Sequence, residues 1–278
     1  MNELPIYSAA EFKPDTEGVF VGLPEATYRA APGVNVSPLP YAEDSMATYK
    51  WVIDNPSPPT PDMQFGTILH VAIYEHDRLD QMFVIKPDEF KDFKTKAAQE
   101  WRDSQTLPVL TPEDVETLEM MVRSFNAILE NRDLMERCLR EVSAFKIHPE
   151  TGLLLKGRAD LWDREAPNRD VYDSKKLGGM RATMRNCSIR ITEMNYHQQS
   201  AHYCYLFGAA SFGWFFHTDT PPYEVGQFYA SETMLIAGHE KNERAYRNIA
   251  DCRKTGVWPG RFRKIELQKW QQEETNEI

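Results

Sequence analysis

Asp160, Asp173 and Lys175 are the residues of the stretch LLLKGRADLWDREAPNRDVYDSKK, residues 153–176, that could do chemistry together. Its outer segments are rich in β-branched, aromatic and alternating residues, whereas REAPNR between them contains proline, asparagine and charge, so the pattern predicts a β-hairpin. If the hairpin folds symmetrically about its turn, Asp160 and Asp173 face each other across the strands, and Lys175 shares a face with Asp173. Opposed carboxylates repel, so the pair calls for a bound cation or a nearby lysine, unless the hairpin merely exposes an acidic face to solvent.

Hydrolysis of a phosphodiester is one reaction that this set of side chains can support. The reaction needs an in-line water, neutralisation of the charge that develops around phosphorus, and assistance to the leaving oxygen. Divalent cations held by carboxylates supply all three. Asp160 and Asp173 would form the negative pocket for such cations. The backbone carbonyl of Ser174 lies between Asp173 and Lys175, and Lys175 could orient water or stabilise charge.

The residues before the hairpin predict helices that lead into a β-meander. The segment DMQFGTILHVAIYEH has the periodicity of a buried amphipathic helix, with His70 beside its apolar side and Gly66 suggesting close packing. Such a histidine is either a hydrogen-bonded core residue or a ligand, and the helix alone does not decide which. A second helix starts at Thr111 and is expected to run to about Asn131, and a short helix, DLMERCLR, is expected to follow it. EVSAFKIH then reads as a strand, so that it, LLLKGRADLW and DVYDSK form three consecutive antiparallel strands.

The residues after the hairpin predict a polar row on a helix. A flexible basic segment, GGMRATMRNCSIR, is expected to enter a long helix capped near Thr192. On this helix Tyr196, Gln199 and Tyr203 recur at intervals of three and four residues and therefore lie along one face. They either pack against a sheet or remain available to a ligand. GWFFHT and YEVGQFYAS complete a sheet of about five strands, and a last long helix begins at Ser231.

The composition indicates a globular protein that would meet an anionic ligand with one face only. The chain has 278 residues, 41% of them hydrophobic, and a formal net charge of -10. This excess of acid argues against coating nucleic acid with the whole surface, but Arg181, Arg185 and Arg190 form a local basic cluster. We find no membrane-length apolar run, no signal-peptide pattern and no close pair among the four cysteines. We therefore expect a cytoplasmic protein with free thiols and no zinc or iron–sulfur site.

The order of these parts resembles the PD-(D/E)XK nuclease superfamily, and more closely the RecE-type (exonuclease VIII) recombination exonucleases of phages and prophages. The likeness rests on GTILH, Glu141, KGRAD, DSK and then Y-x-x-Q-x-x-x-Y. It spans about residues 60–210, with weaker likeness in the VWPG turn. The resemblance implies an α/β (α+β) fold with a restriction-endonuclease-like core, in which helices flank a central mixed β-sheet of about five strands.

The resemblance also implies a metal site. His70 and Asp160 would hold one divalent ion. Asp160, Asp173 and the carbonyl of Ser174 would hold a second, with Mg²⁺ expected and Mn²⁺ as a substitute. Lys175 would position or activate the attacking water. The adjacent lysine, the second of the KK pair, leaves open which of the two acts, and strand alternation favours Lys175.

Further residues receive roles around this metal site. Glu141 matches a frequently acidic position and would support catalysis. Gln199 and Tyr203 would contact the DNA backbone beside the scissile phosphate. We also expect the phosphate backbone to be contacted by three basic residues, Arg158, Arg181 and Arg185.

The activity that the resemblance implies is a magnesium-dependent 5′-to-3′ exodeoxyribonuclease acting on linear double-stranded DNA. It would leave a 3′ single-stranded overhang for a RecT-like strand-annealing recombinase. Relatives form rings around DNA, so a homo-oligomer, trimeric or tetrameric, encoded by a phage or prophage in a bacterial cell is implied. Two alternatives stay open: a DNA-binding or assembly module that keeps the fold without cleavage, and an endonuclease specific for a structure or sequence.

The chain is expected to contain one nuclease domain. Residues 1–40 carry proline and glycine without periodicity and would form an arm or irregular edge with one strand at most. Residues 41–265 would form the nuclease domain, and residues 266–278 a frayed C-terminal tail. No Walker A motif is present in the sequence, so a fused helicase motor is not expected.

Overall fold

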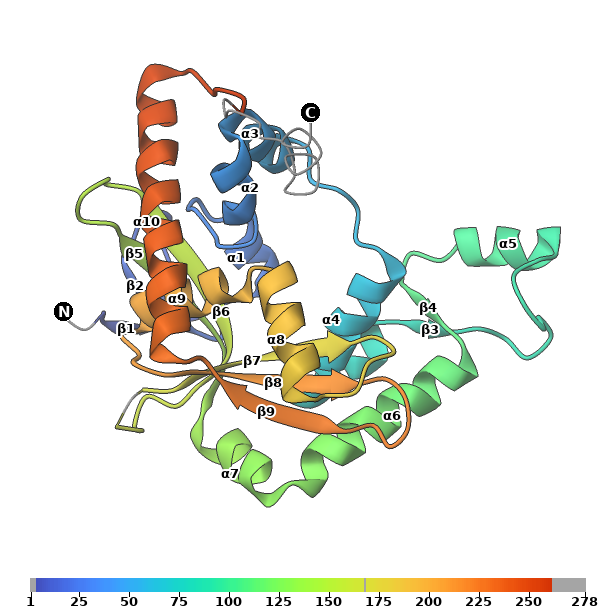
Figure 1. Cartoon of the computed structure of the whole chain (residues 1–278). Coiled ribbons are helices and arrows are strands. Elements are labelled where there is room, and N and C mark those ends of the chain that lie inside the picture. Colours follow the sequence, from blue (N-terminus) through green and yellow to red (C-terminus); the bar gives the residue numbers. More distant parts are fainter. Residues whose placement is uncertain (1–3, 168, 262–278) are drawn as a thin grey trace, which may run out of the picture.

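A mixed β-sheet forms the centre of the protein in a computed structural model that describes residues 4–167 and 169–261 (Figure 1). In spatial order the seven strands are β1 (Ile6–Ser8), β2 (Gly18–Val21), β5 (Leu139–Ile147), β6 (Leu154–Trp162), β7 (Val171–Leu177), β8 (Phe212–Thr218) and β9 (Val225–Tyr229). The pairs β1·β2 and β7·β8 are parallel, and the other neighbours are antiparallel. A separate parallel pair is formed by β3 (Val84–Ile85) and β4 (Val109–Leu110).

Helices cover both faces of the main sheet. One face packs against α8 (Met184–Glu193), α9 (Tyr196–Phe207) and α10 (Glu232–Thr255), with α2 (Leu39–Asp44) and α3 (Met46–Asp54) alongside. The other packs against α4 (Pro61–Tyr74), α6 (Pro112–Ala127) and α7 (Leu129–Arg137). The short α1 (Glu25–Ala30) follows β2, two 3-10 turns span Ala9–Glu11 and His76–Gln81, and α5 (Lys96–Asp103) projects from the body in Figure 1. The predicted α/β fold with a mixed sheet flanked by helices is confirmed.

Alternate residues of β8 show how the sheet separates two cores. Trp214 and Phe216 belong to the core beneath α9 and α10, whereas Phe215 between them belongs to the core beneath α4 and α6. All three are fully buried, as expected for a strand covered on both faces. Within the described part of the chain, no helix is long and apolar enough to cross a membrane.

The predicted hairpin is present in the predicted register. β6 and β7 pair through Leu161↔Tyr172 and Trp162↔Val171, and continuing this register places Asp160 opposite Asp173. The backbone pairing ends before these two acids, where like charges oppose each other and the strands separate. The three-strand meander of β5, β6 and β7 is likewise confirmed.

The sheet is larger at its N-terminal edge than the sequence predicts. The expectation was a sheet of about five strands, with one strand at most from residues 1–40. In the structure both β1 and β2 come from these residues, and β2 pairs with β5 through Val19↔Ala144 and its neighbours. The strands are three and four residues long, too short for a periodic signal, and they are stabilised by the pairing partner rather than by local sequence. The predicted tail, residues 266–278, lies outside the described residues.

Several helix boundaries differ from the predicted ones. The helix expected to run to about Asn131 ends at Ala127, and α7 begins two residues later. The basic segment expected to be flexible is the helix α8, because Thr183 caps it by accepting a hydrogen bond from the Asn186 amide. α8 and α9 are separated at Asn195, whose backbone has a left-handed φ of 53°. Asparagine tolerates this conformation, which redirects the chain between the two helices.

Two helical glycines are expected to respond oppositely to substitution by alanine. An added Cβ at Gly238, on α10, would lie 1.9 Å from the His197 carbonyl oxygen, because α10 crosses the start of α9 closely there. Gly238→Ala should therefore destabilise the protein by about 3 kcal/mol, despite the better helix propensity of alanine. At Gly66, on α4, a Cβ would meet nothing within 4 Å, so the predicted close packing is wrong. Gly66→Ala should stabilise the protein by about 0.5–1 kcal/mol. Urea unfolding measures both, and equal signs would contradict this account.

Candidate active site

Asp160 lies on β6 where the backbone pairing is interrupted on both sides. The β5–β6 ladder has one gap, which falls between the pairs Arg140↔Leu161 and Val142↔Ala159. This gap places Glu141 of β5 beside Asp160. On the other side, where β7 separates from β6, the Ser174 amide donates a hydrogen bond to Asp160 Oδ2 at 2.7 Å. The carboxylate of Asp160 thus takes the place of a backbone partner and lies at the junction of three strands.

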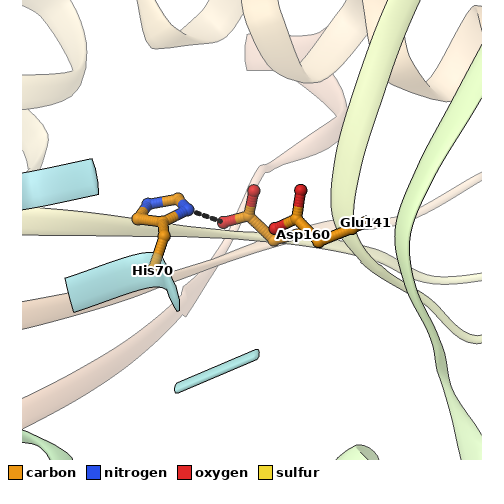
Figure 2. Close-up of side chains that lie close together, drawn as sticks. All are labelled: His70, Glu141 and Asp160. Atoms are coloured by element: carbon orange, nitrogen blue, oxygen red, sulfur yellow. Dashed lines mark ion pairs between the residues drawn. The ribbon is translucent and has the colours of Figure 1, made fainter. Parts of the chain in front are cut away.

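Three side chains converge at this junction. The ligand atoms of His70, Glu141 and Asp160 all lie within 4.8 Å of one another. Figure 2 shows His70 and Glu141 on opposite sides of Asp160, with His70 projecting from α4 and the two acids from adjacent strands. The structure thus brings His70 and Asp160 together, although they are 90 positions apart in the sequence. Their roles as metal ligands remain predictions.

His70 makes contacts with both of its ring nitrogens. Nδ1 lies 3.3 Å from Asp160 Oδ2, and Nε2 lies 3.0 Å from the carbonyl oxygen of Ser174. Burial lowers the pKa of His70, but the neighbouring Asp160 carboxylate more than offsets this and raises the pKa to about 9. The charged imidazolium can donate to both oxygens. A metal ion bound here would replace this positive charge, and binding would release the proton.

Glu141 is held in an unusual backbone conformation. Its φ of 50° is left-handed, which is uncommon for any residue other than glycine. Arg158 donates from Nε to Glu141 Oε2 at 2.7 Å, and both side chains are mostly buried. Burial raises the pKa of Glu141 to about 7, the Asp160 charge adds to this, and Arg158 opposes it. Strained conformations of this kind persist where the surroundings impose them, and they cluster at functional sites.

Asp173 and Lys175 lie on the face of β7 that packs against α9. Lys175 Nζ forms an ion pair with Asp173 Oδ2, as the alternation of the strand predicted. Gln199 of α9 donates from Nε2 to Asp173 Oδ1 at 2.8 Å. Burial raises the pKa of Asp173, Lys175 lowers it, and Asp160 raises it further. Asp173 does not belong to the tight three-residue group, and its two oxygens contact Lys175 and Gln199 instead.

The two adjacent lysines of β7 face opposite sides of the sheet. Lys175 Nζ lies 4.8 Å from the centre of the Tyr196 ring, on the α9 side. Lys176 Nζ forms ion pairs with Asp62 at 2.6 Å and Asp219 at 3.0 Å. Lys175 is therefore the lysine beside the acidic cluster, which agrees with the preference derived from strand alternation.

Two residues that the sequence did not identify support Ser174 from the α4 side. The Ser174 hydroxyl lies 2.6 Å from the Tyr74 hydroxyl and 3.0 Å from His217 Nε2. His217 is fully buried, and burial lowers its pKa to about 3, so the ring is neutral. These contacts orient Ser174, whose amide and carbonyl face Asp160 and His70. Tyr74 follows His70 at a helical spacing of four, which could have indicated it, but nothing in the sequence connects His217 to Ser174.

The residues expected to contact DNA occupy different environments. Arg181 and Arg185 are exposed, before and within α8, so their side chains are accessible to a phosphate backbone. Tyr203 is only 8% exposed and packs against Gly157, where an added Cβ would lie 3.0 Å from its ring. Arg158 is directed to Glu141 and is largely buried. Contact of these residues with DNA remains a prediction, and in the structure Arg158 donates a hydrogen bond to Glu141.

The chemistry of the donor set fits a hard divalent cation. Carboxylate oxygens from Glu141 and Asp160, a backbone carbonyl from Ser174 and one imidazole are ligand types suited to Mg²⁺ or Mn²⁺. The four cysteines contribute nothing, because none has a thiol in this cluster. A bound cation would also balance the two carboxylates of Glu141 and Asp160, which lie side by side where the strands separate. The cluster is a candidate acidic/histidine site for a divalent ion.

Comparison with known proteins supplies the family. The sequence profile of the PD-(D/E)XK nuclease superfamily matches residues 43–275. The chain belongs to this superfamily. The match includes Asp160, Asp173 and Lys175, whose assignment to the family's signature remains a prediction. Membership makes the protein a nuclease of this superfamily by family assignment, and it implies a nucleic acid as substrate.

A solved structure shows the same fold at low sequence identity. A candidate exonuclease from Eubacterium rectale has a TM-score of 0.57 at 12% identity, over 89% of this chain and 94% of its own. A phage-related exonuclease from Haemophilus somnus 129PT is 10% identical over 81% of this chain and 97% of its own, with a TM-score of 0.36, which is too low to support an argument. A search of curated proteins found no match.

Proposed function

We propose that this superfamily member is a metal-dependent 5′-to-3′ exodeoxyribonuclease of the RecE type, which acts on linear double-stranded DNA and leaves 3′ overhangs. The observation that supports it most is the meeting of a D…D-x-K set with a histidine. Asp160 lies between His70 and Glu141, and Asp173 carries Lys175 beside it. If the hairpin merely exposed an acidic face to solvent, these acids would not be buried. Asp160 is 6% exposed and Asp173 is 3% exposed.

The metal site would use the ligands predicted from the sequence, with Mg²⁺ as the ion, Mn²⁺ as a substitute and two ions per site. His70, Asp160, Asp173 and the Ser174 carbonyl would hold them. When bound, such ions stabilise the charge that develops on the phosphate and lower the pKa of water. The direct contacts of His70 with Asp160 and with Ser174 support the grouping of these ligands.

The protein's own groups would position the substrate and the water. Lys175 Nζ, fixed by Asp173, would orient the attacking water and stabilise negative charge. Gln199 is fixed by its bond to Asp173, which would place it beside the scissile phosphate. Arg181 and Arg185 would contact the DNA backbone farther along the strand, as exposed cations do.

The exonuclease polarity and the biological setting rest on resemblance. GTILH, KGRAD, DSK and Y-x-x-Q-x-x-x-Y resemble the RecE-type enzymes, and the structure from Eubacterium rectale carries the name of an exonuclease. A phage or prophage origin, a RecT-like annealing partner and a ring-shaped homo-oligomer would follow from this resemblance. In such a ring the local basic clusters would line a DNA channel, while the acids that give the net charge of -10 would face outward.

A substrate panel tests the proposal. Purified protein is incubated with linear duplex, covalently closed circular duplex and single-stranded DNA, each with Mg²⁺ or with a chelator. We expect loss of the linear duplex alone, only with Mg²⁺, and release of a label from the 5′ end before one from the 3′ end. The reason is that an exonuclease needs a free end, whereas the chelator removes the ion that balances the acids.

Each other outcome of the panel identifies an alternative. Cutting of the closed circle would indicate an endonuclease of the same superfamily. Binding of duplex without loss of any substrate would indicate a DNA-binding module that keeps the fold. Release of the 3′ label first would agree with an exonuclease but contradict the proposed 5′-to-3′ polarity.

A further inference from the structure

Arg158 connects the acidic cluster to the N-terminal part of the chain. Its Nε donates to Glu141 Oε2 at 2.7 Å, and its Nη1 donates to the Leu23 carbonyl at 2.6 Å and to Ser143 Oγ at 3.2 Å. The side chain is only 12% exposed. Because the guanidinium is planar and rigid, these contacts fix Glu141 and the backbone before α1 in one mutual geometry.

Lys156 holds the same N-terminal segment at a second point, two residues before Arg158 on β6. Its Nζ donates to the carbonyl oxygens of Tyr28, Arg29 and Ala31 at 3.1, 3.2 and 2.6 Å. These carbonyls lie at the C-terminal end of α1, where a cation satisfies free acceptors and the negative end of the helix dipole. Residues 18–31 are therefore fastened to β6 by two cations.

The conformation of Glu141 explains why it needs such a partner. A left-handed glutamate at a gap in a β-ladder has lost its backbone pairing, and its carboxylate lies among other acids. Left to itself, the side chain would move away from Asp160. The charge-assisted bond from Arg158 holds Oε2 and keeps the carboxylate in the three-residue group with His70 and Asp160.

We propose that Arg158 is a positioning residue that holds Glu141 as an additional acidic ligand of the metal site, and that residues 18–31 complete this site by fixing Arg158. The inference rests on the proposed function in one respect, which is that a divalent ion binds at His70 and Asp160. The N-terminal segment is then a wall of the active site, and Arg158 acts inside the protein rather than on DNA.

The affinity for Mn²⁺ shows whether Arg158 acts by positioning Glu141 or only by its positive charge. Mn²⁺ binding is measured from the paramagnetic resonance signal of free Mn²⁺, on protein first treated with chelator and without any DNA. Arg158→Lys keeps the charge but cannot reach Glu141 Oε2 and the Leu23 carbonyl together, so it should weaken Mn²⁺ binding about tenfold or more. Arg158→Met should weaken it at least as much, and Glu141→Gln likewise. Ser143→Ala removes only the longest contact and should bind Mn²⁺ as the wild type does.

Amide hydrogen exchange tests the part played by residues 18–31. If Arg158 couples the segment to the metal site, the coupling is reciprocal, so the ion must stabilise the segment. Adding Mn²⁺ should slow exchange in residues 18–31 of the wild type and of Ser143→Ala. The same addition should leave exchange in this segment of Arg158→Lys unchanged. Circular dichroism of each variant shows that it is folded. Glu141→Gln leaves the contacts of Arg158 and Lys156 with residues 18–31 in place.

The outcomes distinguish this inference from the function on which it rests. If the wild type binds Mn²⁺ no better than Asp160→Asn, the metal site itself is wrong. If the wild type binds Mn²⁺ and Arg158→Lys binds it equally well, the site stands and the positioning role of Arg158 is wrong. If Arg158→Lys binds weakly while Mn²⁺ leaves exchange in residues 18–31 of the wild type unaffected, the role of the N-terminal segment is wrong.

Discussion

Asp160→Asn should abolish Mg²⁺-dependent cleavage of linear duplex DNA while leaving the protein folded. Asparagine keeps the shape of the side chain and can still accept the hydrogen bond from the Ser174 amide, but it removes the charge at the junction of three strands. Metal ions contribute several kcal/mol of transition-state stabilisation, and each 1.4 kcal/mol corresponds to a factor of ten. We therefore expect a loss on the order of 10³-fold or more in kcat, measured by release of end label at saturating DNA.

Thermal unfolding provides the control for this variant. Mn²⁺ should raise the Tm of the wild type, because an ion that binds only the folded state stabilises it, and the Tm of Asp160→Asn should not respond. Circular dichroism at low temperature should show the same secondary structure for both. Cleavage by Asp160→Asn within tenfold of the wild type would place the active site elsewhere.

Lys175→Met should abolish cleavage with little effect on metal affinity. Lys175 Nζ is paired with Asp173 beside the acidic cluster, where it is placed to orient water. Groups that assist proton transfer or orient a nucleophile contribute roughly 10²–10⁴-fold. We expect a loss in kcat of that size at saturating Mg²⁺, while Mn²⁺ binding, measured without DNA, stays close to that of the wild type.

The adjacent lysine is a matched control for Lys175. Lys176→Met removes the same charge one residue away, but from the opposite face of β7, where Lys176 pairs with Asp62 and Asp219. It should cleave DNA at close to the wild-type rate and lose about 1 kcal/mol of stability, measured by urea unfolding. If Lys176→Met were inactive and Lys175→Met active, the assignment of the two lysines would be reversed.

The β6–β7 hairpin could be predicted from the local sequence pattern. Alternation and turn composition were sufficient to predict β6, β7 and their register, because a two-strand hairpin is decided by residues close together in the chain. The same reasoning placed Lys175 and Asp173 on one face. It also predicted the start of the last helix at Ser231, since helix ends carry short and specific signals.

The two strands at the N-terminal edge of the sheet could not be predicted from the local sequence pattern. β1 and β2 are three and four residues long; β2 becomes a strand because β5 offers a partner more than 100 residues away in sequence, and β1 then pairs with β2. Short strands have no periodicity to detect, and their pairing is decided by contacts between distant segments. The end of α6 at Ala127 and the start of α9 after Asn195 differ from the predicted boundaries for a related reason, because a helical pattern that continues across a turn gives no clear stop.

The sequence by itself determined which residues could do chemistry here: His70, Asp160, Asp173, Lys175 and Glu141 were identified from residue types, order and the resemblance they carry. Only the tertiary structure decided how they meet. Glu141 and Asp160 are neighbours because β5 and β6 lose their backbone pairing at this point. This gap in the ladder accompanies the left-handed φ of Glu141, which cannot be predicted from the residue type. Arg158 has a charge suited to DNA, but the fold directs it to Glu141 and Leu23. Composition specifies a charge, whereas the packing of distant segments decides what that charge contacts.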